Sequence, residues 1–321
     1  MRFIVTGLIS ATAFALGLLV FCPVQAQPEP PSDEWDAMPR VALGVYDPHS
    51  EFSSENAIDI EHIFVYWQAL DMQALKDRMA YARQRGRDMI VTVEPYTKAA
   101  NWRFGGEHLF SDITAGEFDA EINTLCSALS EFDGRLFIRW GQEMEDPTGR
   151  YPWARDDSDG YKSAYRYFVD SCRGKLPEAE FIWSPKGLHN LADYYPGDAD
   201  VDYIGVAVWG HQGVDRDRYG GERRFEQTFE EKYDRVARFG KPVYIAELGV
   251  AGEPDYRSDW LRSLYESILE GEFGLLRGVI YFNDKEPHQW PMDYGSPDWR
   301  IQPSWFSNAP RAPAAGDKPA H

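Results

Sequence analysis

The sequence has few basic residues, few cysteines and few histidines, and each shortage narrows what the protein can be. Across 321 residues, 33 Lys and Arg face 52 Asp and Glu, which gives a formal charge of -19 at pH 7. Nucleic-acid binding requires a basic surface that neutralises phosphates, and docking on anionic lipid requires the same sign of charge. We therefore expect neither nucleic acid nor a membrane as a partner of the mature protein.

Motifs of several enzyme classes are also missing. No GxGxxG follows the first predicted strand, so a nucleotide-binding sheet has little support. There is no GxSxG nucleophile elbow and no CxxC or Cys/His cluster that would indicate structural zinc. The seven His are scattered, and His62 and His211 stand alone rather than in an HxH pair on an early strand. We therefore expect no metal site.

Aromatic residues are abundant. The chain is 43% hydrophobic and 15% aromatic, with 11 Trp and 18 Tyr, which predicts a sizeable folded core. Aromatic faces flanked by acids suit a neutral, ring-shaped ligand such as a sugar. The alternative, that most of these rings fill the core, stays open.

The N-terminus is typical of an exported protein. Residues 1–26 begin with one Arg, continue as an apolar run and close on small residues at a signal-peptidase site, and 27–39 form a Pro-rich acidic linker. A retained membrane anchor is disfavoured because no positive charge flanks the far side, and Phe21 before Cys22 disfavours lipidation. We expect a secreted or periplasmic monomer. Export makes a disulfide between Cys126 and Cys172 possible.

Short apolar runs alternate with helical patterns from residue 40 to residue 305. The runs that predict strands begin at Val41, His62, Asp88, Arg135, Phe181, Val201, Pro242 and Gly278. Eight strand–helix units predict a single-domain (β/α)8 TIM barrel, with an open doubly wound sheet as the alternative. The tail, 306–321, is rich in Pro, Ala and Gly and is predicted to be disordered.

Active residues of such a barrel lie at the C-terminal ends of the strands. Aromatic and acidic residues gather there: Tyr46, Tyr66, Trp67, Glu94, Glu143, Trp183, Trp209 and Glu247. An acid that ends an apolar strand is costly to bury unless it is paired or used.

Glu143 and Glu247 are the candidates for chemistry. Alternation along a strand predicts that Phe137, Arg139, Gly141 and Glu143 share one face, and that Val243, Ile245 and Glu247 share another. Two carboxylates facing each other suit glycosidic bond hydrolysis, at about 5 to 5.5 Å apart for a retaining enzyme, and the charge of Arg139 would keep the nucleophile ionised. The alternative is an internal salt-bridge network. Glu145 and Asp146 are predicted to lie in the loop beyond the strand, without a role in the chemistry.

Five blocks in order, between Arg135 and Ile301, resemble glycoside hydrolase family 26. They are "RWGQEMEDPTGRYPW", "IWSPKG", "YYPGDADVDYIGV", "KPVYIAELG" and "YFNDKEPHQW" with "DWRI". The resemblance implies a retaining (β/α)8 enzyme without a cofactor, with Glu143 as acid/base and Glu247 as nucleophile. It implies a substrate such as β-mannan, mixed-linkage β-glucan or β-1,3-xylan, with Trp153 and Trp183 lining sugar subsites. We expect His211, Asn283 and Trp299 to contact substrate as well.

Two positions depart from the family's pattern. Gln142 replaces the His that usually precedes the acid/base, and Trp209 replaces a Tyr that normally supports the nucleophile. Both changes concern the subsite of the scissile sugar and put mannan specificity in question more than hydrolysis.

Our first hypothesis is an exported endo-acting β-glycanase. A non-hydrolytic glycan-binding barrel that assists polysaccharide export, and a transglycosylase that uses the same residues, are the alternatives.

Overall fold

The computed structural model describes residues 40–97, 106–290 and 292–307. Eight parallel strands close into a barrel in which each strand pairs with its neighbours in the sequence and β1 pairs with β8. The strands are β1 Ala42–Tyr46, β2 Ile60–Tyr66, β3 Asp88–Glu94, β4 Leu136–Trp140, β5 Glu180–Trp183, β6 Tyr203–His211, β7 Val243–Ala251 and β8 Leu276–Phe282. The predicted TIM barrel is confirmed.

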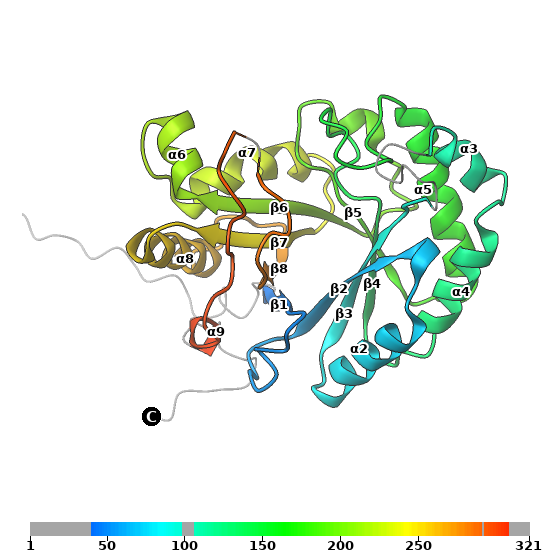
Figure 1. Cartoon of the computed structure of the whole chain (residues 1–321), viewed down its shortest axis with the longest axis horizontal. Helices are drawn as coiled ribbons and strands as arrows, with labels where there is room; N and C mark the ends of the chain where they lie inside the picture. The colour runs from blue at the N-terminus through cyan, green and yellow to red at the C-terminus, as the bar shows by residue number, and fades with distance from the viewer. Residues whose placement is uncertain (1–39, 98–105, 291, 308–321) are drawn as a thin grey trace, which may run out of the picture. The chain divides into compact units, whose positions relative to one another are not determined.

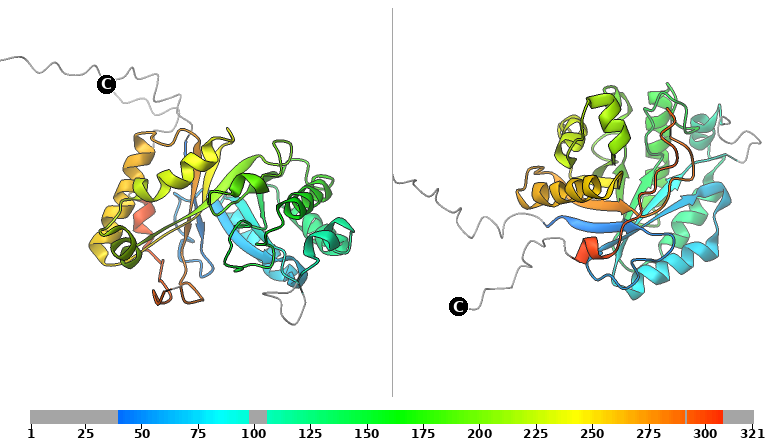
Figure 2. Two further views of the ribbon diagram at one scale, coloured as in Figure 1. Left: turned by 90° about the horizontal axis from the view of Figure 1, so that it is seen from above. Right: turned by 60° about the vertical axis from the view of Figure 1, so that its left-hand side comes forward.

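Helices lie on the outside of the strands (Figures 1 and 2). They are α2 Met72–Gln84, α3 Leu109–Thr114, α4 Asp119–Leu129, α5 Ser158–Arg173, α6 Gln212–Tyr219, α7 Phe225–Ala237, α8 Pro254–Leu269 and α9 Ser304–Ser307. Not every strand is followed by an α-helix. Residues 47–59, after β1, form turns because they are polar and lack apolar periodicity, and the Pro-rich segment after β5 holds only a short 3-10 helix, Leu191–Tyr194.

Two apolar cores stabilise the barrel. A large one lies between the strands and the helices, and a smaller one fills the barrel interior with Ile60, Ile90, Phe137, Ile182, Tyr244 and Ile280. Above this interior layer the inward side chains become polar. His62 Nε2 lies 2.7 Å from Thr92 Oγ1, and Arg139 Nη1 lies 3.4 Å from the same hydroxyl. The polar layer supports the open end of the barrel, where the strands end.

A disulfide joins α4 to α5. Cys126 and Cys172 are bonded, with Cα atoms 5.4 Å apart, which resolves the pairing that the sequence left open. None of the helices among the described residues is long and apolar enough to cross a bilayer.

Several predicted segments fall outside the described residues: the signal at 1–26, the linker at 27–39 and the tail from residue 308. The predicted boundary of the tail at residue 306 is wrong. Phe306 lies in α9 and is buried, with its ring 5.4 Å from that of Phe52 and 6.0 Å from that of Tyr281. Apolar burial of Phe306 therefore holds the chain in place beyond Trp305.

Candidate active site

Glu143 reaches the barrel mouth from a tight turn rather than from a strand. β4 ends before Gly141, and Gly141 and Glu143 both have positive φ, 55° and 54°. Such a conformation is uncommon for a non-glycine residue and needs support from its surroundings. The Glu143 N–H donates to the Ser184 carbonyl at 2.8 Å, and the Trp153 indole donates to the Gln142 carbonyl at 2.7 Å. The prediction that a continuous strand aims Glu143 is therefore wrong, although its side chain does line the cavity.

The two acids that follow hold this turn in place. Glu145 is buried, and its carboxylate accepts from two backbone N–H groups in the loop after β5, at 2.8 and 3.2 Å. Asp146 accepts from Lys186 Nζ at 2.7 Å. Burial raises the pKa of Glu145, whereas the hydrogen bond from Lys186 lowers that of Asp146 against the effect of burial. Both acids lie in the loop, as predicted, and they tie the β4 loop to the β5 loop.

Glu247 reaches the same cavity through an irregularity in β7. Val243 and Ile245 belong to the core between strands and helices, whereas Tyr244 belongs to the cluster inside the barrel. The pairing with β6 shifts register just before Ala207, which is then opposite Glu247. An extra residue of this kind re-aims the side chains that follow it. The prediction that Glu247 shares a face with Val243 and Ile245 is therefore wrong, because the irregularity turns Glu247 inward.

Arg139 supports Glu247 from inside the barrel. Its side chain is fully buried, its Nη1 donates to Glu247 Oε1 at 2.6 Å, and its Nε donates to Ser184 Oγ at 2.8 Å. Burial raises the pKa of Glu247, the guanidinium of Arg139 opposes that rise, and the neighbouring Glu143 adds to it. The ion pair thus favours the ionised form of Glu247 against desolvation.

A third carboxyl group, that of Glu94, lies at the end of β3. Gln142 Nε2 donates to Glu94 Oε1 at 2.7 Å. Burial raises the pKa of Glu94 to about 7, the hydrogen bond from Gln142 lowers it, and the charge of Glu247 raises it. Gln142 is itself buried and is not among the residues that line the cavity, so its amide nitrogen serves Glu94.

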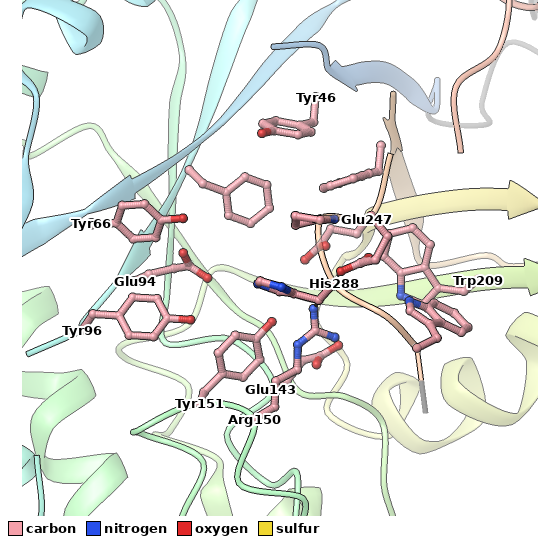
Figure 3. Close-up of a pocket in the computed structure, with 15 residues that line it drawn as sticks. Tyr46, Tyr66, Glu94, Tyr96, Glu143, Arg150, Tyr151, Trp209, Glu247 and His288 are labelled. Carbon is pink, nitrogen blue, oxygen red and sulfur yellow. Dashed lines mark ion pairs between the residues drawn. The ribbon is translucent and has the colours of Figure 1, made fainter. Parts of the chain in front are cut away.

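Two aromatic walls flank the carboxylates. A tyrosine wall, Tyr66, Tyr96 and Tyr151, comes from the β2, β3 and β4 ends, and a tryptophan wall, Trp209 and Trp290, comes from β6 and the β8 loop. In Figure 3 the tyrosines and Trp209 lie on opposite sides of the cavity, with the two catalytic candidates between them. Aromatic faces on both sides suit the apolar faces of sugar rings.

The structure brings six predicted site residues to the cavity and adds others. Those predicted are Tyr46, Tyr66, Glu94, Glu143, Trp209 and Glu247. Those missed are Phe64, Tyr96, Arg150, Tyr151, Phe282, Glu286, Pro287, His288 and Trp290. Most of the missed residues follow β3, β4 or β8, so their position after a barrel strand was a signal that the sequence offered.

Four predicted tryptophan contacts need correction, because these side chains are at most 2% exposed. Trp67 stacks on Phe118 outside the barrel, and Trp183 packs in the outer core. Trp153 lies behind Tyr151, with ring centroids 4.7 Å apart, and Trp299 lies behind Trp209 at 4.8 Å. The last two support the walls rather than form them.

Asn283 and His211 also have structural contacts. Asn283 is fully buried, its Oδ1 accepts from the Ile301 N–H at 2.9 Å, and its Nδ2 donates to Glu51. His211 precedes α6, accepts from the Val214 N–H at 3.3 Å and stacks on the Trp290 ring. Neither lines the cavity. Within the described ranges, no group of three or more His, Cys, Asp or Glu side chains is placed to hold a metal ion.

Comparison with known proteins gives distant relatives. No family model matches the chain. It is 24% identical to endoglucanase H of Acetivibrio thermocellus over 261 residues, which cover 77% of this chain and 26% of that protein. It is 21% identical to β-1,3-xylanase TXYA of a Vibrio species over 198 residues, 56% of this chain and 42% of that one. The chain thus spans less than half the length of these curated relatives.

Solved structures give the fold directly. A modular endo-β-1,4-mannanase of family 26 from Cellulomonas fimi superposes with a TM-score of 0.62 at 13% identity, over 89% of this chain and 70% of that one. A family 26 β-mannanase from Bacteroides ovatus gives a TM-score of 0.59 at 16% identity, over 86% and 90%. The chain therefore has the fold of these family 26 enzymes, and its sequence is distantly similar to that of the curated glycanases.

Proposed function

We propose that this protein is a retaining endo-β-glycanase that hydrolyses a β-linked polysaccharide such as β-mannan, β-1,3/1,4-glucan or β-1,3-xylan. The observation that carries the proposal is that Glu143 and Glu247 line one cavity at the C-terminal end of the barrel, with Arg139 bonded to Glu247 at 2.6 Å. Paired carboxylates are the groups that glycosidic cleavage requires. The family 26 fold and the distant similarity to glycanases support the same reaction.

The first step forms a glycosyl-enzyme intermediate. The Glu247 carboxylate attacks the anomeric carbon while Glu143 gives its proton to the departing glycosidic oxygen, so the C–O bond to the leaving chain breaks as the ester bond forms. Arg139 suits Glu247 to this role because it opposes the rise in pKa that burial causes.

The second step releases the sugar. Glu143, now a carboxylate, takes a proton from water, and the resulting hydroxide attacks the anomeric carbon and frees Glu247. Two inversions leave the product with the β configuration of the substrate. The tyrosine and tryptophan walls would hold the sugar rings by stacking.

We also propose that the protein is exported through a signal at residues 1–26. The composition of that segment supports export, as does the disulfide between Cys126 and Cys172, since disulfides persist mainly in oxidising compartments. Expression in a Gram-negative host tests this. Mass spectrometry of the periplasmic or secreted product should give a mature N-terminus after Ala26, and an uncleaved cytoplasmic product would contradict it.

The activity is tested by measuring reducing ends released from mannan, mixed-linkage glucan, cellulose, curdlan and β-1,3-xylan by the wild type and by Glu247→Ala. We expect the wild type to hydrolyse at least one polymer and the variant to lose that activity. Activity that survives the substitution would refute the mechanism. Binding without hydrolysis of any polymer would favour the glycan-binding alternative.

A further inference from the structure

One ion pair joins two loops that start on opposite sides of the barrel. Arg150 lies in the loop after β4 and Glu286 in the loop after β8, and Arg150 Nη2 lies 3.5 Å from Glu286 Oε1. In a closed barrel of eight strands in sequence order, β4 and β8 are separated by three strands on either side. A contact between their loops therefore has to pass across the barrel mouth.

Both residues line the cavity that holds Glu143 and Glu247. In Figure 3 the Arg150 side chain lies beside Glu143, between Tyr151 and Trp209. Burial lowers the pKa of Arg150, but its neighbours Tyr151, Glu143 and Glu286 raise it by more, so the guanidinium stays charged. The pair thus spans the space that a bound polysaccharide has to cross.

The two ends of the pair are held differently. Glu286 is 8% exposed, and its backbone N–H donates to the Pro297 carbonyl within a loop that an antiparallel bridge between Lys285 and Asp298 closes. The side chain of Arg150 is 49% exposed and follows Gly149, which has a φ of 66° and no atoms near its Cβ position. Arg150 is therefore the end that is able to move.

We propose that Arg150 and Glu286 form a strap across the catalytic cleft and thereby determine the length of glycan that the site accepts. A short oligosaccharide can enter from one side and leave the pair intact, whereas an internal stretch of polymer has to separate it. The inference rests on the proposed function, because it concerns how the same substrate enters. Because the Arg150 end of the pair is half exposed, separating the pair should change relative rates by roughly fivefold.

The experiment compares kcat/KM on a polymer that the wild type hydrolyses with kcat/KM on its trisaccharide. Glu286→Gln keeps the shape of the side chain and removes its charge. We expect the polymer-to-trisaccharide ratio to rise about two- to fivefold. The charge-swapped double variant, Arg150→Glu with Glu286→Arg, should bring the ratio back toward the wild-type value. Salt at about 0.5 M should raise the ratio of the wild type but not that of Glu286→Gln, because it screens the pair.

The matched control is Asp259→Asn, which removes an exposed ion pair with Arg262 on α8, outside the cavity. It should leave the ratio unchanged. An unchanged polymer-to-trisaccharide ratio in Glu286→Gln would overturn the strap. So would a charge-swapped variant that lowers kcat/KM equally on polymer and trisaccharide, because Arg150 would then simply contact substrate.

Failure of the proposed function gives a different result. If the wild type hydrolyses none of the polymers, affinity electrophoresis in gels containing each polymer replaces the rates. Stronger retardation of Glu286→Gln than of the wild type would support the strap even then. Equal retardation, or none in any gel, would overturn it.

Discussion

Glu143 and Glu247 enter one cavity from strand ends that are built differently. At the β4 end, Glu143 sits in a turn of positive φ that backbone carbonyls, an indole and the buried Glu145 hold in place. At the β7 end, Glu247 is turned inward by a shift in register and is bonded to the buried guanidinium of Arg139. One end is fixed mainly by its backbone and the other mainly by charge.

This difference matches the roles that we propose for the two residues. A nucleophile has to be ionised before it attacks, so a cation beside Glu247 favours the reactive form. An acid/base residue has to transfer a proton to and from the reacting oxygen, so a rigid frame that fixes its position suits Glu143. Changes at the β7 end should therefore act through protonation, and changes at the β4 end through position or proton transfer.

The largest effect is expected from removing Glu247, the proposed nucleophile. Glu247→Gly should lower kcat by roughly 10³-fold or more, because no covalent intermediate forms. With an activated aryl glycoside, added azide should restore turnover and give the α-glycosyl azide, since azide displaces the leaving group with a single inversion. NMR of the product checks this. A β-glycosyl azide would exchange the roles assigned to the two strand ends.

Glu143→Ala should have the next largest effect, and its size should depend on the leaving group. Natural glycosidic bonds should lose roughly 10²- to 10⁴-fold in rate because their leaving oxygen needs a proton. Aryl glycosides with acidic phenols should lose far less in the first step. Rates measured over a series of phenols check the role. Equal losses for every leaving group would mean that Glu143 does not donate the proton.

Arg139→Ala should lower kcat/KM about 10- to 100-fold and move the acidic limb of its pH profile upward. Arg139 lowers the pKa of Glu247, so its removal raises that pKa, and a higher pH is needed to ionise the nucleophile. Arg139→Lys keeps the charge and should shift the limb less. An acidic limb that stays in place in the alanine variant would show that Arg139 acts only by packing.

Glu94→Gln should change how stability depends on pH. The pKa of Glu94 lies at about 7, above the ordinary value of 4.5, so the folded state binds this proton more tightly than the unfolded state. That contribution is complete below pH 4.5 and is lost as the pH rises through 7. The variant avoids this loss. Between pH 4.5 and pH 8, the difference in the free energy of unfolding between variant and wild type should therefore shift by about 2 to 3 kcal/mol in favour of the variant. Urea unfolding at both values checks this, and an equal difference at both would contradict it.

Glu145→Ala should have the smallest effect on chemistry, because it acts on the frame. Without the Glu145 carboxylate, two backbone N–H groups in the loop after β5 lose their acceptor. We expect the free energy of unfolding to fall by about 1 to 3 kcal/mol and kcat to fall a few-fold. The pH profile should not move. Glu230→Ala, on the exposed side of α7, is the matched control. A shifted pH profile in Glu145→Ala would remove the distinction between the two ends.

The barrel could be predicted because each of its strands is a short apolar run, and such a run can be recognised from the amino-acid sequence alone. The two carboxylates could be chosen because an acid at the end of such a run is costly to bury, which indicates that it is paired or functional. How each one is aimed could not be predicted. "YIAELG" reads as a regular strand and gives no sign of the register shift before Glu247, and nothing in "WGQE" indicates a positive φ at Glu143. Both features depend on neighbouring strands.

Aromatic side chains were the least predictable part of the site. Trp153 follows β4 and Trp209 lies near the end of β6, yet Trp153 is buried behind the tyrosine wall and Trp209 lines the cavity. The difference arises from tertiary packing, which composition does not reveal. The residues of the β8 loop could have been predicted. Glu286 and Trp290 come shortly after a predicted strand, where a barrel places its binding residues.

The central claim is that Glu247 becomes covalently bonded to the sugar. Incubation of the wild type with the 2-deoxy-2-fluoro glycoside of the sugar that the polymer assay identifies, carrying a dinitrophenyl leaving group, should slow release and trap the intermediate. Peptide mapping by mass spectrometry should then find one fluorosugar on Glu247. A label on Glu143, or no label while the enzyme hydrolyses the same glycoside, would contradict the account.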